Sequence, residues 1–134
     1  MARLPETQSV SGWPKILLRL EGAALLATAV FICFVLSVDW RLFALLFFFP
    51  DLSFVAYLAG PKPGAAAYNS VHTTSLPLAY GALAYWLGAP FILQIAVIHL
   101  AHIGLDRALG FGLKYETDFG DTHLGRLRRT EANN

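Results

Sequence analysis

The chain has 134 residues, of which 56% are hydrophobic and only 14% are charged, and its net charge is +1. Soluble domains carry about 25% charged residues, so this composition favours a membrane protein. The near-zero net charge excludes the basic surface typical of nucleic-acid binding. The single cysteine, Cys33, lies in an apolar run. It cannot form an internal disulfide and is expected to pack as a small hydrophobe.

Four apolar segments follow one another along the chain, and each is close to the ~20 residues that span a bilayer. We expect helices over about 15–38, 41–60, 64–88 and 90–113, followed by a polar tail over 114–134. The links "DWR", "GPKPG" and "GAP" are short, and short links force neighbouring helices to run antiparallel. The sequence therefore predicts an all-α fold, a single antiparallel bundle of four transmembrane helices.

The distribution of positive charge predicts the orientation of this bundle. Four crossings place both termini and the "GPKPG" link on one side of the membrane, and Arg41 alone lies on the other side. By the positive-inside rule, both termini and the polar tail are expected in the cytoplasm. The basic residues on the cytoplasmic side are Arg3, Lys15, Arg19, Lys62, Lys114, Arg126, Arg128 and Arg129.

Ionisable residues occur at similar depth on three of the expected helices. At 1.5 Å per residue, Asp51, His72, His102 and Asp106 lie roughly 10–16 Å from the cytoplasmic end. On the last helix, His99, His102 and Asp106 fall within an arc of about 60°. Pro50 precedes Asp51, and a proline kink could turn that carboxylate inward.

Such groups are costly in a membrane helix and usually mark a functional site. Metal coordination would offset this cost, because imidazole and carboxylate groups are good ligands for Zn, Mn or Fe. We therefore predict a site for a divalent metal ion, first of all Zn, with Asp51, His72, His102 and Asp106 as ligands.

Other polar residues are expected around this site. Tyr68 and Asn69 share the face of His72 and are expected to hold a ligand by hydrogen bonding. Asp121 and His123 are expected to lie over the mouth of a cavity that faces the cytoplasm. The alternative for this polar tail is a solvated extension whose basic residues contact lipid headgroups.

Three residues are expected to take part in chemistry. Glu21 is a candidate base for a metal-bound water, His99 is a candidate ligand or base, and Arg107 is a candidate for holding an anionic group. For Glu21 the alternative is an ion pair with Arg19 or Arg107.

Two long strings carry a resemblance to a known family. "FFFPDLSFVAYLAGPKPGAAAYNSVHTTSLPL" and "HLAHIGLDRALGFGLKY…F…DTHLGR" resemble the small bacterial membrane proteins grouped as domain-of-unknown-function family 4260. The resemblance extends from Leu18 to Arg126. It implies a multi-pass protein of the bacterial inner membrane.

A weaker resemblance connects the chain with membrane-bound metal-dependent hydrolases of the bacterial inner membrane. The motifs "PDLS", "YNSVHTTS" and "AHIGLDRALG" follow that family's order and helix placement. Asn69 stands near the position of that family's first histidine, the second acid of its "PD" motif is missing, and His99 is extra. This resemblance implies that Asp51, His72, His102 and Asp106 are metal ligands.

The leading prediction is a metal-dependent hydrolase that acts on a membrane-associated substrate, such as a lipid or a phosphorylated small molecule. Three alternatives stay open. The His/Asp stripe could be the relay of a proton- or ion-coupled carrier, or part of a di-metal membrane oxidase. It could also be a hydrogen-bonded polar core that joins helices in a structural protein. A homo-oligomer is compatible with the sequence.

Overall fold

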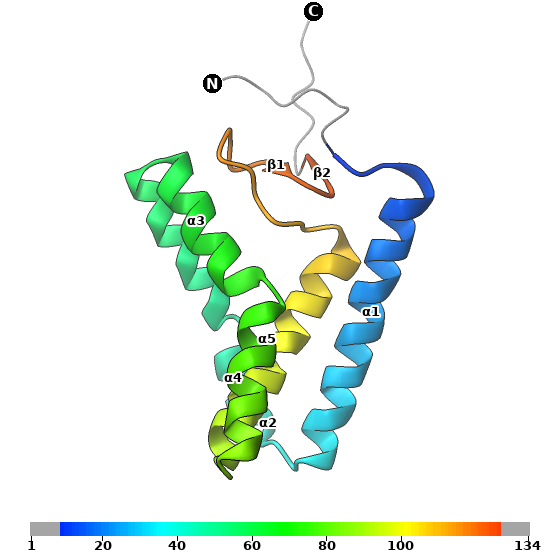
Figure 1. Ribbon diagram of the computed structural model, residues 1–134, viewed down its shortest axis with the longest axis vertical. Coiled ribbons are helices and arrows are strands. Elements are labelled where there is room, and N and C mark those ends of the chain that lie inside the picture. Colours follow the sequence, from blue (N-terminus) through cyan, green and yellow to red (C-terminus); the bar gives the residue numbers. More distant parts are fainter. Residues whose placement is uncertain (1–8, 127–134) are drawn as a thin grey trace, which may run out of the picture.

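The computed structural model describes residues 9–126, so the last eight residues of the expected tail, and also Arg3, lie outside the described residues. The described chain is mostly helical and contains one short antiparallel hairpin, in which Asp121 pairs with Arg126, so the expected all-α class is confirmed (Figure 1). The elements are α1 (Gly12–Val35), α2 (Trp40–Phe47), the 3-10 helix η2 (Phe49–Ala59), α3 (Pro61–His72), α4 (Ser75–Trp86), α5 (Pro90–Leu109), β1 (Asp121–Thr122) and β2 (Gly125–Arg126).

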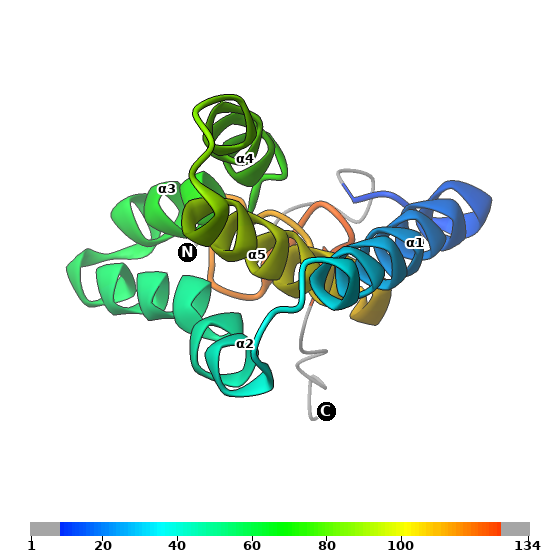
Figure 2. The ribbon, with the colours of Figure 1, turned by 90° about the horizontal axis from the view of Figure 1, so that it is seen from below.

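Helix α5 is the centre of the fold. It packs against α1, α2 and α4, whereas α3 packs mainly against η2, and a view along the bundle shows α5 surrounded by these helices (Figure 2). The contact with α1 is close because glycines lie at the crossing. A Cβ atom added to Gly104 would lie only 2.6 Å from the backbone nitrogen of Leu26. Small residues let membrane helices approach in this way.

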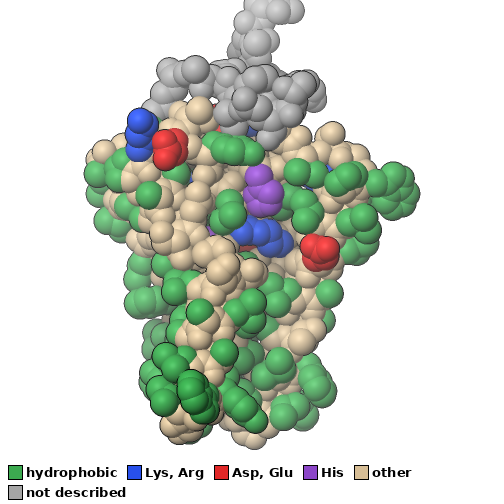
Figure 3. Space-filling model, viewed as in Figure 1, with side chains coloured by type: hydrophobic (Ala, Val, Ile, Leu, Met, Phe, Trp, Pro, Cys, Tyr) green, Lys and Arg blue, Asp and Glu red, His purple; other side chains and the backbone are tan. Residues whose placement is uncertain are grey.

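Within residues 9–126, three helical segments are long and apolar enough to cross a membrane, namely Gly12–Val35, Trp40–Ala59 and Pro90–Leu109. Trp13 is exposed near one end of the bundle, and Trp40 and Trp86 are exposed near the other, as expected for side chains at the two membrane interfaces. On the face shown in Figure 3, the charged side chains gather in the upper half and the lower half is apolar. These features identify a membrane protein.

The expected continuous helix over 64–88 is instead two helices. Helix α3 ends at His72, Thr73 is extended (φ −84°, ψ 137°), and α4 begins at Ser75. The physical reason is Pro77, whose ring would clash with the carbonyl of Thr73 if the helix continued. The break leaves His72 in the last turn of α3.

The second expected helix also changes character at its proline. Helix α2 ends at Phe47, and η2 follows as a 3-10 helix with Pro50 near its start. A 3-10 helix has three residues per turn, so side chains three positions apart share a face. One such face begins with Phe49 and is exposed and apolar, and another face begins with Asp51. The exposed residues are Phe49, Leu52, Val55 and Leu58.

Helix α5 ends at Leu109, four residues earlier than the expected boundary at 113. Gly110 adopts the left-handed conformation (φ 89°), and the N–H of Phe111 donates to the carbonyl of Asp106 at 2.7 Å. Residues 111–126, which we call the cap, then fold back over this end of the bundle (Figure 1). Lys114, Asp121 and Leu124 are buried within the cap. The described part of the tail is therefore packed against the helices, and it is not a solvated extension.

Candidate metal centre

Four side chains from three helical segments meet beneath the cap. Asp51 comes from the first turn of η2, His72 from the last turn of α3, and His102 and Asp106 from successive turns of α5. One ligand atom from each lies within 4.8 Å of all the others. These are the four residues that the sequence analysis predicts as metal ligands, and the structure brings them together.

The distances between these ligand atoms have the size expected for one coordination shell. The Nε2 atoms of His72 and His102 are 3.2 Å apart. Asp51 Oδ1 lies 3.3 Å from each of them, and Asp106 Oδ2 lies 3.5 Å from His72 and 3.2 Å from His102. A tetrahedral ion with bonds of ~2.0–2.1 Å requires ligand-to-ligand distances of roughly 3.3 Å. Five of the six ligand pairs therefore fit a tetrahedral site. The sixth pair is formed by the carboxylates of Asp51 and Asp106, whose ligand atoms lie within 4.8 Å of each other.

The ring of His72 is held in the orientation that a ligand needs. Its Nδ1–H donates to the carbonyl of Tyr68 at 2.8 Å, and the ring stacks on that of Tyr68 with centroids 3.7 Å apart. A hydrogen bond from one ring nitrogen fixes the tautomer and leaves the lone pair of the other free for a metal. Tyr68 therefore orients His72 through its backbone carbonyl and through ring stacking, and not through the side-chain hydrogen bond that the sequence predicts.

The ring of His102 is placed by helix packing. The side chain is 2% exposed, and its ring stands edge-on to Phe47 at 5.3 Å. Within the described residues, its Nδ1 has no hydrogen-bond partner. Its Nε2 atom faces Asp51 and Asp106. All of its polar contacts are therefore made through the nitrogen that points into the cluster.

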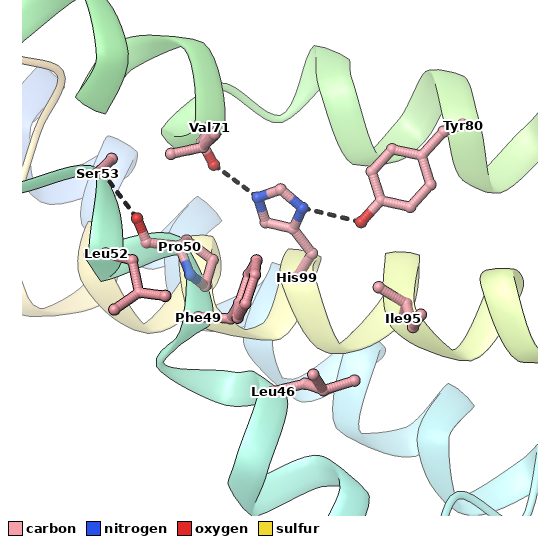
Figure 4. A pocket seen from close by; sticks show the side chains of 9 residues that line it. All are labelled: Leu46, Phe49, Pro50, Leu52, Ser53, Val71, Tyr80, Ile95 and His99. Carbon is pink, nitrogen blue, oxygen red and sulfur yellow. Dashed lines mark hydrogen bonds between the residues drawn. The ribbon is translucent and has the colours of Figure 1, made fainter.

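His99 lies outside the cluster because both of its ring nitrogens are already engaged. Its Nε2–H donates to the carbonyl of Val71 at 2.6 Å, and its Nδ1 accepts from the hydroxyl of Tyr80 at 2.9 Å (Figure 4). Val71 belongs to α3 and Tyr80 to α4, so His99 joins α5 to both of these helices. In this arrangement it is neither a ligand nor a free base.

Arg107 and Glu21 also differ from their expected roles. Arg107 donates from Nη2 to the carbonyl of His72 at 2.8 Å and from Nη1 to that of Phe111 at 2.7 Å. It thereby joins the end of α3 to the start of the cap. Because these donors are bonded to backbone carbonyls, the guanidinium group is not placed to bind an anion, which is the role that the sequence predicts. Glu21 is exposed on α1, next to the glycine that packs against α5, and the structure does not bring it to the cluster.

Asn69 anchors the cap instead of supporting a ligand. Its Nδ2 donates to the carbonyl of Lys114 and its Oδ1 accepts from the N–H of Lys114, both at 2.7 Å. This pair of hydrogen bonds joins residues 45 positions apart in the chain. It sets the position of Lys114 over the cluster.

Asp121 and His123 hold the cap together from within. Asp121 accepts from the hydroxyl of Thr117 at 2.7 Å and pairs with Arg126 at 3.2 Å. His123 Nδ1 accepts from the N–H of Leu113 at 2.8 Å. Burial, and then the charge of Arg107, lower the pKa of His123. Neither side chain belongs to the four-residue cluster.

A pocket of about 260 Å³ connects the cluster with the cap. We call it the cap pocket. The carboxylates of Asp51 and Asp106 open into it, so the cluster is accessible to a small molecule. The other residues that line it include Phe54, Tyr68, Lys114 and Phe119.

Lys114 is the residue of this pocket that the sequence pattern did not indicate. It is 4% exposed, and its Nζ donates to the carbonyl of Phe119 at 2.7 Å and lies 3.7 Å from the centre of that ring. Burial lowers its pKa to about 8, against the opposing effect of Asp106 and Asp118, so the side chain is mostly protonated at pH 7. The sequence feature that could have indicated this buried lysine is its position directly after the apolar run "GFGL".

Comparison with known proteins confirms the resemblance to domain-of-unknown-function family 4260. The family model described as domain of unknown function (DUF4260) matches residues 15–127. The chain belongs to this family. The matched region of this DUF4260 protein contains the whole cluster and the cap pocket. No curated protein and no solved structure matches the chain.

Proposed function

We propose that this DUF4260 protein is a membrane-embedded, metal-dependent hydrolase whose metal ion is held by Asp51, His72, His102 and Asp106. The observation that carries the proposal is the set of ligand-atom distances of 3.2–3.5 Å between the two imidazoles and the two carboxylates. Two nitrogen and two oxygen ligands suit Zn, and also Mn or Fe.

The chemistry of a hydrolase requires that water and substrate reach the ion. When bound, such an ion would lower the pKa of a coordinated water and polarise the scissile group. Asp51 is the more exposed carboxylate, at 34% against 13% for Asp106, and it opens into the cap pocket. Asp51 would be both a ligand and the carboxylate best placed to accept a proton from a water molecule in the cap pocket. Exposed Glu21 has no part in this mechanism.

The site belongs to the cytoplasmic half of the bacterial inner membrane in this proposal. The N–H of Val10 donates to the carbonyl of His123 at 2.9 Å, so the start of α1 and the cap lie at one end of the bundle. The basic side chains of Lys15, Arg19 and Lys62 belong to the same end, which the positive-inside rule assigns to the cytoplasm. The substrate is a lipid-like or phosphorylated molecule that reaches the site from the bilayer.

A hydrogen-bonded polar core is the second candidate, because the same distances are also compatible with imidazoles shared between carboxylates. The two candidates differ in metal content. The test is elemental analysis of protein purified without chelators, with His102→Gln and Asp106→Asn as the ligand variants and His99→Gln as the matched control on α5.

We expect about one equivalent of transition metal in the wild type, together with a lower melting temperature once the ion is removed, since bound metal stabilises the fold. The ligand variants should lose the metal and His99→Gln should keep it. Hydrolysis of p-nitrophenyl phosphate should follow metal content. A folded wild type that is metal-free, and that takes up no added Zn, Mn or Fe, would overturn the proposal in favour of the polar core.

A further inference from the structure

A second pocket is formed by residues of α2, η2, α3, α4 and α5. We call it the lateral pocket (Figure 4). Its volume is about 450 Å³, within the range of ~300–1,000 Å³ typical of small-molecule sites. Within the described residues, it shares no lining residue with the cap pocket and contains no residue of the four-residue cluster. It is therefore a separate site. Most of its lining is apolar and includes Leu46, Phe49, Val71 and Ile95.

The lateral pocket opens toward the bilayer. Two of its lining residues, Phe49 and Leu52, are 63% and 61% exposed and belong to the apolar outer face of η2. That face lies within the span Trp40–Ala59, which is apolar enough to cross a membrane. An occupant of this pocket accordingly enters from the lipid phase, and an apolar chain is the chemistry that the lining accepts.

The polar side chains of the lateral pocket have already committed their protons. The Nε2–H of His99 donates to the carbonyl of Val71, so Nδ1 of the neutral ring can only accept, and the hydroxyl of Tyr80 donates its one proton to it. The hydroxyl of Ser53 donates to the carbonyl of Pro50 at 2.8 Å. Among the described residues that line this pocket, no hydroxyl or imidazole proton is therefore left for a ligand.

These polar groups can still accept hydrogen bonds, because each hydroxyl oxygen keeps unshared lone pairs. The oxygen of Tyr80 begins a chain of two hydrogen bonds that continues through His99 to a backbone carbonyl (Figure 4). Hydrogen bonds in such a chain polarise one another, which favours a further donor at Tyr80. A ligand with a hydroxyl group satisfies this acceptor, whereas an ether, ester or ketone has no proton to donate.

From this arrangement we infer that the lateral pocket binds a membrane alcohol, a neutral molecule with an alkyl or isoprenoid chain and a hydroxyl group. Its chain packs against Phe49 and Ile95, and its hydroxyl donates to the oxygen of Tyr80. This site goes beyond the proposed metal-dependent function and does not depend on it, because the metal ligands lie outside the lateral pocket.

The test is photolabelling of the purified full chain with decan-1-ol that carries a diazirine on its chain, and with the methyl ether of the same compound. Both are compared at equal mole fraction in micelles of an amine-oxide detergent, which has no hydroxyl group. Labelling of the peptides that contain Phe49 and Ile95 should be about threefold or more stronger with the alcohol. It should saturate, and unlabelled decan-1-ol should displace it.

Two sets of variants locate the chain and the hydroxyl. Ile95→Trp fills the pocket and should remove the labelling by both compounds, whereas Ile92→Trp, on the same helix but outside the lateral pocket, should behave as the wild type. In Tyr80→Phe alone, Nδ1 of His99 would become a free acceptor, so the informative variant is Tyr80→Phe combined with His99→Leu. It should reduce labelling by the alcohol to the level of the ether. Tyr85→Phe, which changes an exposed tyrosine of the same helix, is its control.

Unchanged labelling by the ether in the double variant would show that the pocket is intact. Equal labelling of the wild type by alcohol and ether would overturn the inference and leave the pocket as a place for lipid chains. A preference for the alcohol that persists in the double variant would overturn it as well. A metal-free protein with the expected labelling would reject the proposed function and leave this site standing.

Discussion

The α1–α5 pair and the η2–α3 pair contribute to the same site in different ways. Helices α1 and α5 are continuous and cross closely through Gly22 and Gly104. On α5, His102 and Asp106 lie one turn apart, so regular helix geometry aligns them. By contrast, Asp51 and His72 lie beside interruptions of their helices, at the start of η2 and the end of α3. One pair supplies a rigid frame and the other supplies ligands whose direction depends on helix breaks.

The largest effect is expected from breaking the rigid frame. Gly104→Leu places side-chain atoms where the backbone of Leu26 lies, because even a Cβ atom would approach to 2.6 Å. We expect a loss of about 3 kcal/mol or more, at the upper end of overpacking effects, seen as a lower melting temperature in detergent. Gly120→Ala is the control, since a Cβ there meets nothing within 4 Å. Wild-type stability of Gly104→Leu would show that α1 and α5 are not in close contact.

The helix break at Pro50 can be removed without changing any ligand. In Pro50→Ala the restored N–H allows α2 to continue as an α-helix, which would turn Asp51 away from the cluster. We expect metal affinity to fall about 10–100-fold, as for the loss of a positioning group, measured by competition with a chromogenic chelator. Pro61→Ala at the first position of α3 should have little effect. Equal affinities for both variants would mean that the break does not direct Asp51.

The clamp between the two pairs is Arg107, which belongs to α5 and bonds to the carbonyl of His72. Arg107→Met removes this bond and the bond to Phe111. We expect metal affinity to fall by about tenfold, in the same chelator competition, with the helical content retained. Arg19→Met is the control, because Arg19 also bonds to a backbone carbonyl of α5, that of Ala108, but at an exposed position. A larger loss in the control would reject the clamp.

The smallest expected effect concerns the cap and pH. The pKa of His123 is lowered from 6.5 in the folded state, so its neutral form stabilises the cap. That contribution is present above pH 6.5 and is lost as the pH falls from 6.5 toward the lowered pKa. The Leu113 amide donates to His123. Its hydrogen-exchange protection factor should therefore be lower at acidic pH, relative to the protection factors of the other cap amides. A His123→Gln variant should lack this pH dependence, and an unchanged dependence would assign the titration to another group.

Much of the cluster was accessible from the sequence because depth and helical periodicity are local properties. The spacing of His102 and Asp106 on one helix, and the matching depth of Asp51 and His72, were enough to select the four residues that converge. The same reasoning could not exclude His99, which shares their stripe. Its exclusion depends on Val71 and Tyr80, whose positions follow from the break between α3 and α4.

By itself, the sequence determined the membrane class, the helical fold and the four candidate ligands, since composition and periodicity act on each helix separately. Only the tertiary structure decided which polar groups are engaged elsewhere and which line a pocket. Lys114 is buried over the cluster because Asn69, far away in the chain, holds its backbone. Arg107 donates its hydrogen bonds to backbone carbonyls because the end of α3 and the cap meet at its side chain. Such roles depend on contacts between distant segments, and no local pattern encodes them.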